Sequence, residues 1–322
     1  MIAYYFPMVS FKKINLLVLS TLAFSMTLHA HAEKYQLTQT LKTGLKTTYA
    51  TFNGKQYWII GQQGNQKGIF TFGNKMVQKA PVVPADAMNL SLDFTSKYLV
   101  VRGIRHLEVF DRNSWAKVAS FESKGLLVNM GFISKNIIFE TTQKPGFVTL
   151  SGGGELLMFR EDKKAFSVLS PDGFDVIDFD SSTSQVALWG TYANDGKILH
   201  GNIDQGLKNL DIDLRVEFVR DITILDPNRY LVFDDLYHVT DNTRKLDQRL
   251  KSSGPNASLK MPGHTIQWKS TEVVMFDPQK DQVTPIYKDK TFSKMITNVF
   301  KLSDTSFAVS FDDGTLQEYA LK

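Results

Sequence analysis

The sequence contains no cysteine in its 322 residues. Disulfide bonds, thiolate metal sites and cysteine nucleophiles are therefore excluded, and so is lipid anchoring through an N-terminal cysteine. The fold must rely on its apolar core. A domain of about 300 residues buries roughly 75% of the surface of its unfolded chain, so it needs no covalent cross-link.

An excess of charge of one sign is also missing. Lysine and arginine number 37 against 33 aspartate and glutamate residues, for a formal net charge of +4. This balance lacks the dense basic stripe of a nucleic-acid-binding protein, so we expect no nucleic-acid partner. Aromatic residues make up 12% of the chain, which indicates a folded globular protein rather than a disordered one.

A long apolar run occurs only near the N-terminus. Lys12 and Lys13 precede the stretch 14–28, and Ala30-His31-Ala32 places small residues just before Glu33. This order predicts a signal peptide over residues 1–32, with Met1 or Met8 as the start, followed by one domain over 33–322. A membrane anchor is the alternative, but the run is shorter than the ~20 residues that span a bilayer. We expect a periplasmic or secreted protein of a Gram-negative bacterium, with no membrane span after cleavage.

Helical periodicity is missing from the chain after this leader. Short runs of β-branched and aromatic residues alternate instead with glycine, asparagine, aspartate, serine and proline, which is typical of an all-β fold. The clearest runs are Tyr57–Ile60, Tyr98–Val101, Asn136–Glu140, Gln185–Trp189, Tyr230–Phe233 and Ser306–Phe311.

These strands recur in a repeating unit. A strand that ends at a polar turn returns about every 41 residues, which is a typical period for units of four strands. These strand ends lie at Phe72, Phe110, Phe159, Asn202, Thr240, Phe276 and Tyr319. In each unit an inner strand comes first, then a short turn, the most apolar strand, a longer loop and the strand that ends at the polar turn. The inner strands include 88–94, 127–133, 174–179 and 295–302. Six to eight units fit the chain, and seven fit it best.

The last unit is one strand short. Residues 295–321 supply three strands, whereas residues 34–41 form a strand that belongs to no unit. We expect this N-terminal strand to complete the last unit and close a ring, because two unpaired edges would favour aggregation. The alternative is that both end strands remain edges.

The repeat resembles the β-propeller superfamily, in particular WD40-like and YVTN-type bacterial propellers. The resemblance covers essentially all of the chain after the leader. It implies the architecture and a tendency to bind partners. No repeat ends in Trp-Asp or opens with Gly-His, the motifs of WD40 repeats, so the resemblance assigns a function to no residue.

Catalytic motifs are missing as well. Residues 114–117 match S-x-x-K and residues 42–44 match K-T-G, but their order is the reverse of that in penicillin-binding enzymes. The glycines 152–154 precede a strand rather than a helix and therefore indicate a turn. The histidines at 106, 200, 238 and 264 are isolated in sequence. We expect no catalytic residue, metal site or cofactor. Whether the protein is an enzyme stays open, with a preference for none.

The loops between the second and third strands supply the candidate binding residues. A cationic group comprises Arg102, Arg105 and His106, and an opposite aromatic and acidic group comprises Tyr192, Asp195, Asp234, Tyr237 and His238. We predict a non-enzymatic, protein-binding or scaffold module of the bacterial envelope. The alternatives are a carbohydrate-binding propeller, and an enzyme of the lactonase, lyase or glycosidase type whose channel carboxylates would be Asp175, Asp178 and Asp221.

Overall fold

The structure is a computed structural model, and it describes most of the chain from Lys34 onward. The described ranges are 34–86, 89–124, 138–141, 145–170, 176–180, 185–189, 198–203, 205–210, 222–226, 228–232, 235–240, 243–249, 257–280 and 282–322. No helix occurs within these ranges, and accordingly none is long and apolar enough to cross a membrane.

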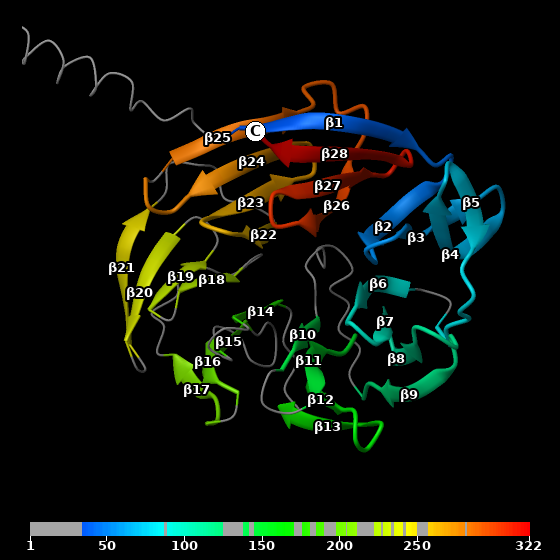
Figure 1. Cartoon of the computed structure of the whole chain (residues 1–322). Coiled ribbons are helices and arrows are strands. Elements are labelled where there is room, and N and C mark those ends of the chain that lie inside the picture. Colours follow the sequence, from blue (N-terminus) through cyan, green and yellow to red (C-terminus); the bar gives the residue numbers. More distant parts are fainter. Residues whose placement is uncertain are drawn as a thin grey trace, which may run out of the picture.

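Within the described ranges, twenty-eight strands form seven four-stranded antiparallel sheets that follow one another around a ring (Figure 1). Blade 1 comprises β2 (Lys46–Phe52), β3 (Tyr57–Gln63), β4 (Gln66–Gly73) and β5 (Met76–Lys79). Blade 2 comprises β6 (Asn89–Phe94), β7 (Tyr98–Gly103), β8 (His106–Asp111) and β9 (Lys117–Glu122). Blade 3 comprises β10 (Ile138–Glu140), β11 (Gly146–Leu150), β12 (Leu156–Arg160) and β13 (Ala165–Ser170). Blade 4 comprises β14 (Val176–Asp180), β15 (Gln185–Trp189), β16 (Ile198–Asn202) and β17 (Lys208–Leu210).

Blade 5 comprises β18 (Ile222–Asp226), β19 (Arg229–Val232), β20 (Asp235–Thr240) and β21 (Thr243–Arg249). Blade 6 comprises β22 (Ala257–Met261), β23 (His264–Lys269), β24 (Glu272–Asp277) and β25 (Gln282–Lys288). Blade 7 comprises β26 (Ile296–Ser303), β27 (Ser306–Phe311) and β28 (Thr315–Leu321), and β1 (Tyr35–Lys42) is its outer strand. This architecture is a seven-bladed β-propeller.

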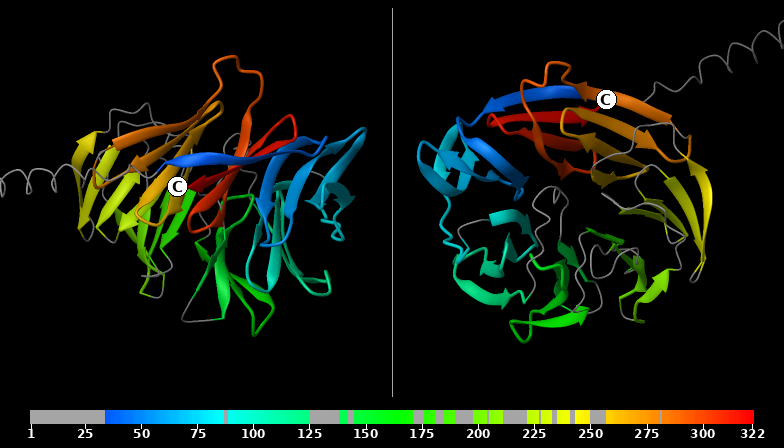
Figure 2. Two further views of the ribbon diagram at one scale, coloured as in Figure 1. Left: turned by 45° about the horizontal axis from the view of Figure 1, so that its top comes forward. Right: turned by 180° about the vertical axis from the view of Figure 1, so that it is seen from behind.

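The N-terminal strand closes the ring, as predicted. Strand β1 pairs antiparallel with β28, from Tyr35 opposite Leu321 to Lys42 opposite Thr315. The Tyr35 hydroxyl also lies 2.9 Å from Nε2 of His264 in blade 6, and the Thr43 amide donates to the Gly314 carbonyl at 3.0 Å. The first and last described strands therefore lie in one sheet, which Figure 2 shows from two further sides.

The core lies between the blades, since each sheet buries both of its faces. Tyr98 and Val100 of β7 join the cluster shared with blade 3, whereas Leu99 and Val101 join the cluster shared with blade 1. Side chains alternate along a strand, so a strand buried on both sides must be apolar at nearly every position. This explains the short continuous apolar runs in the second strands β3, β7 and β15, whereas β23 also buries Thr265 and Gln267.

The outer strands are the exposed edges of the blades. Five of the seven carry an irregularity in their pairing, namely β1, β9, β13, β21 and β25. A bulge twists an edge and disrupts its ladder, which opposes pairing with another chain.

Blade 3 differs from the prediction. The sequence suggested residues 127–133 as its inner strand and Asn136–Glu140 as its second strand, but Ile138–Glu140 is the first strand and β11 is the second. The glycines after β11, with Gly154 at a φ of 83°, turn the chain so that β11 and β12 form a hairpin rather than one long strand. Residues 127–133 lie outside the described residues.

The antiparallel order gives the ring two faces. We call proximal the face that carries the turns between second and third strands and the connections from each blade to the next. The distal face carries the other two turns of each blade. In blade 3 the connection between Glu140 and Gly146 joins the first two strands, so it belongs to the distal face.

Candidate binding site on the proximal face

Asp86 fixes the turn that carries Arg105 and His106. Its carboxylate lies in the connection from blade 1 to blade 2 and accepts the Arg105 amide at 2.8 Å and the His106 amide at 2.9 Å. Nδ1 of His106 lies 3.2 Å from the same carboxylate. A side chain on Gly103 would place Cβ 2.2 Å from Oδ2 of Asp86, so the close approach requires glycine there.

These contacts also keep Asp86 ionised. Burial by itself would raise the pKa of the carboxyl, but the hydrogen bonds from the His106 and Arg105 amides and from the His106 ring outweigh burial and lower the pKa below its usual value. Arg105 itself is exposed, and the His106 side chain is partly so.

Glu155 performs the same function in the neighbouring blade. Its buried carboxylate accepts the Ser123 hydroxyl at 2.7 Å, the Lys124 amide at 3.1 Å and the Ser151 hydroxyl. Burial is the largest single effect and would raise the pKa of Glu155, but the hydrogen bonds from Ser151, Ser123 and the backbone amides together outweigh it and lower the pKa. The Ser123 amide in turn donates to the Arg105 carbonyl at 2.7 Å, which links this group to the Arg105 turn.

The turns of blades 2 and 3 also touch directly. A Cβ on Gly152 would lie 2.3 Å from the carbonyl oxygen of Gly103 and 2.4 Å from that of Ile104. The β11–β12 turn therefore packs against the β7–β8 turn backbone to backbone. We call the surface from Asp86 through Arg105 to Glu155 the blade 2–3 rim.

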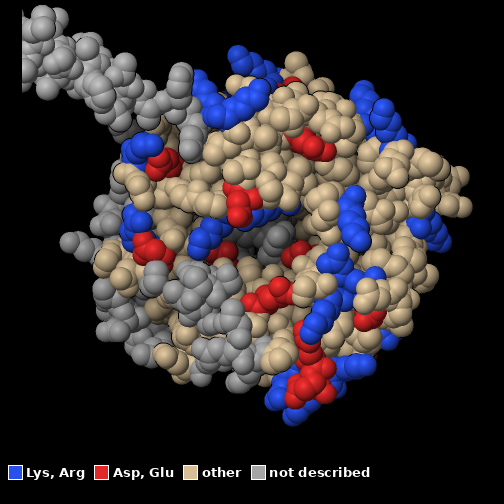
Figure 3. Space-filling view, viewed as in Figure 1, with Lys and Arg blue, Asp and Glu red and all other residues tan. Residues whose placement is uncertain are grey.

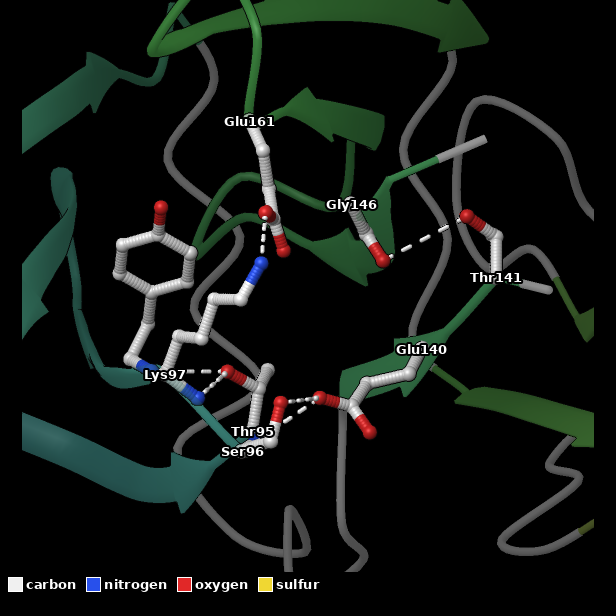
Figure 4. A network of polar contacts seen from close by, with 8 residues as sticks. Thr95, Ser96, Lys97, Glu140, Thr141, Gly146 and Glu161 are labelled. Atoms are coloured by element: carbon white, nitrogen blue, oxygen red, sulfur yellow. Dashed lines mark hydrogen bonds and ion pairs between the residues drawn. The ribbon is translucent and has the colours of Figure 1, made fainter. Parts of the chain in front are cut away.

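The same two blades are joined on the distal face (Figure 4). Glu140 accepts the Ser96 amide at 2.8 Å and the Ser96 hydroxyl at 3.1 Å, and Nζ of Lys97 lies 2.6 Å from Oε2 of Glu161. The lysine is largely exposed, so its ion pair adds little stability, whereas the Ser96 contacts also satisfy a backbone amide. Blades 2 and 3 are thus held together at both faces.

Arg102 does not share the exposed rim with Arg105. It lies within β7 and is 1% exposed, opposite Ser91 of β6 and Leu107 of β8. Burial raises the pKa of the Tyr49 hydroxyl, Asp93 raises it further and Arg102 partly lowers it, so these groups lie within electrostatic reach. Of the predicted cationic group, only Arg105 and His106 therefore reach the surface.

The predicted aromatic and acidic group is only partly described. Tyr237 is 7% exposed and points into the protein, whereas its neighbour His238 is exposed. Both lie on strand β20, which begins at Asp235, so they do not belong to a loop as expected. Tyr192, Asp195 and Asp234 lie outside the described residues.

A hollow lies at the middle of the face in Figure 3, with acidic and basic side chains around it. Of the three expected channel carboxylates, only Asp178 is described. It is buried and accepts the Ile224 amide of the next inner strand at 2.7 Å, so it links blades 4 and 5. Asp175 and Asp221 lie outside the described residues.

Three of the four histidines in the described ranges have separate partners. His106 contacts Asp86, Nδ1 of His200 lies 3.3 Å from the Tyr230 hydroxyl, and His264 contacts Tyr35. No group of three or more histidine, aspartate or glutamate side chains suited to a metal ion occurs in the ranges that the structure describes.

Sequence reasoning missed the two carboxylates that build the rim. Asp86 and Glu155 bind backbone amides and serine hydroxyls that are up to 32 residues away in sequence, and no spacing pattern marks such contacts. Gly103 and Gly152 were visible as turn residues, but the close approach at each depends on the packing of the blades.

Comparison with known proteins supports the fold alone. No family model and no curated protein matches the sequence. Among solved structures, virginiamycin B lyase from Staphylococcus aureus with quinupristin has a TM-score of 0.64 at 10% identity, over 90% of this chain and 100% of that one. The WD40 propeller domain of Doa1 has a TM-score of 0.62 at 11% identity, over 89% and 97%. YCF48 bound to a D1 peptide has a TM-score of 0.59 at 10% identity, over 92% and 97%.

Proposed function

We propose that this chain is an exported, non-enzymatic β-propeller that binds a protein partner through the blade 2–3 rim. The observation that carries the proposal is the hydrogen-bond network that fixes the turns of this rim. Two ionised carboxylates, Asp86 and Glu155, hold the turns that present Arg105. A surface that is ordered before binding loses less conformational entropy when a partner docks, so more of the contact energy appears as affinity.

The composition of the rim suits a protein partner. Arg105 is exposed, and Val83 in the connection that carries Asp86 is 79% exposed. Arginine is enriched among the residues that dominate protein–protein binding energy, and exposed apolar side chains beside it supply area to bury. The peptide bound to YCF48 is a precedent for peptide binding on this fold, not evidence about this chain.

Export is proposed from the leader. Two lysines, an apolar run and Ala30-His31-Ala32 are together typical of a cleaved signal peptide. We place the mature protein in the periplasm or outside the cell of a Gram-negative bacterium, and N-terminal sequencing should then find Glu33 as the first residue.

Substitution of Arg105 tests the binding proposal. We expect Arg105→Ala to weaken binding of a partner, purified after capture from the envelope, by about 30-fold or more, the loss expected of an interface hot spot. Arg160→Ala is the matched control, because Arg160 is an exposed arginine at the distal end of β12 and pairs with Asp162. Isothermal calorimetry should show a loss of affinity for Arg105→Ala and none for Arg160→Ala. Equal affinities of the two variants would contradict the proposal.

A further inference from the structure

We propose that the loop 289–295, which joins blade 6 to blade 7, is an anchor that inserts Phe292 into an apolar pocket of the protein partner. This inference rests on the proposed function and specifies the chemistry of the partner. Phe292 is 72% exposed and Met295 beside it is 42% exposed. We call this segment the Phe292 loop.

The backbone of Phe292 is in an unfavourable conformation. Its φ is 55°, in the left-handed region that bulky side chains rarely adopt. A large apolar side chain is thus displayed to water from a conformation that itself costs free energy. Such a combination persists only where the surrounding structure fixes it, and it is concentrated at functional sites.

The Phe292 loop is fixed in this way by Asp289. Its carboxylate accepts the amide and hydroxyl of Thr291 at 2.8 and 2.6 Å, and the amide and hydroxyl of Ser293 at 2.9 and 2.8 Å. The Lys294 amide adds a fifth contact at 3.3 Å. These hydrogen bonds, with that of the Thr291 hydroxyl the largest, hold the pKa of Asp289 far below its usual value, so the carboxylate stays charged.

Both ends of the loop are tied to the blades. The Asp289 amide donates to the Thr271 carbonyl at 2.9 Å, and the Ile296 amide donates to the Ser270 carbonyl at 2.7 Å. Met295 exchanges two hydrogen bonds with Asp312, at 2.8 and 2.9 Å. The loop is therefore a rigid projection, and Figures 1 and 2 show it in orange rising between β25 and β26.

The charges of the loop favour an apolar pocket over an anionic lipid surface. Nζ of Lys294 lies 3.9 Å from the centre of the Phe311 ring, and Nζ of Lys288 lies 3.1 Å from Oε1 of Glu272. Lys294 is thus turned toward the protein, and Lys288 is paired with Glu272 although it is 55% exposed. Lys290 within the loop is exposed, so the tip presents Phe292 and Met295 together with one lysine rather than a broad basic face. An anionic membrane is bound by an exposed basic face, whereas a protein pocket accepts a rigid aromatic side chain.

The loop also lies on the same face as the blade 2–3 rim. It is a connection between blades, and such connections share the proximal face with the second-to-third-strand turns. One partner can therefore contact Arg105 and Phe292 at once. A rigid aromatic residue at one end and an arginine at the other is a composition typical of binding hot spots.

The test uses photoreactive benzoylphenylalanine at positions 292, 105 and 76 of the full-length exported protein. Met76 is a control, because it is 60% exposed but lies at the distal end of blade 1. We expect the same partner to cross-link at 292 and 105 and not at 76. For the purified partner, Phe292→Asn should weaken binding about 30-fold or more, the loss expected of a hot spot. Asparagine tolerates the left-handed conformation, so this variant removes the ring and leaves the loop fold.

The possible results distinguish failure of the anchor from failure of the proposed function. Cross-links at 105, combined with a Phe292→Asn affinity within twofold of the Met76→Ala control, would overturn the anchor and leave the proposed function standing. Cross-links at neither 105 nor 292 would overturn both. Sedimentation with phosphatidylethanolamine and phosphatidylglycerol vesicles that depends on Phe292, without a protein cross-link at 292, would replace the protein pocket with a membrane. An unchanged melting temperature of Phe292→Asn shows that a loss of binding is not unfolding.

Discussion

At the scale of single residues, the rim depends on carboxylates that act on the backbone. Asp86 holds two amides of one turn, and Gly103 leaves the space in which it does so. Glu155 holds the connection from blade 2, and Gly152 leaves the space between the two turns. These residues display nothing to a partner themselves, but they determine where Arg105 lies.

The lowered pKa of Asp86 gives a pH-dependent prediction. A carboxyl whose pKa is lower in the folded state contributes stability above its unfolded value of about 3.9, and this stability is lost as the pH falls through the lower folded-state pKa. We expect Asp86→Asn to reduce the free energy of unfolding by about 1–2 kcal/mol at pH 7. The difference from the natural protein should shrink as the pH falls below about 4.

Urea titrations between pH 7 and pH 3 measure this difference. Asp162→Asn is a suitable control, because Asp162 is 56% exposed in a surface pair with Arg160 and should change stability little. A constant gap between Asp86→Asn and the natural protein across the pH range would mean that the charge of Asp86 is not what holds the turn.

At the scale of elements, the closing strand joins the two ends of the chain. Strand β1 pairs with β28 along its length, and Tyr35 packs against Phe307 with ring centres 4.8 Å apart. At the junction with blade 1, the Tyr57 hydroxyl contacts Glu318, and a Cβ on Gly314 would lie 2.3 Å from the Leu45 carbonyl oxygen. Blade 7 therefore contacts blade 1 through β28 and the turn at Gly314, and β1 completes the sheet that makes these contacts.

Removal of β1 tests this role. A chain that begins at Lys42 should unfold at least about 10 °C below the protein that begins at Glu33, because it loses a whole strand pairing and the buried Tyr35 ring. It should also self-associate, since β28 becomes an open edge. A peptide of residues 33–42 should restore part of the melting temperature and a scrambled peptide should not. An unchanged melting temperature would mean that the ring does not need β1.

The sequence predicted the strands correctly wherever the pattern of an apolar run followed by a polar turn repeats. All seven strand ends used to find the period lie at or near the end of the third strand of a blade, and the closing strand was predicted from the one missing strand. The prediction for blade 3 was wrong because it placed the apolar run Asn136–Glu140 as the second strand, whereas Gly146–Leu150 holds that position. At the site, the exposure of Arg105 was predicted correctly. Arg102 and Tyr237 were also expected at the surface but are buried, because burial depends on the face of the strand that a side chain occupies.

At the scale of the whole molecule, the closed ring gives the proximal face a fixed geometry. The blade 2–3 rim and the Phe292 loop lie in different blades, and only the packing between blades sets their separation. Apolar clusters connect blades 1 with 2, 2 with 3, 3 with 4, 6 with 7 and 7 with 1. The account therefore treats the proximal face as one preformed binding surface.

The most direct measurement is hydrogen exchange of the protein with and without its purified partner. The account predicts slower exchange on binding in the proximal segments 103–106, 151–155 and 289–295. Exchange in the distal segments 95–97 and 161–164 should not change. Protection confined to the distal segments, or none in any proximal segment, would contradict the claim that this face binds the partner.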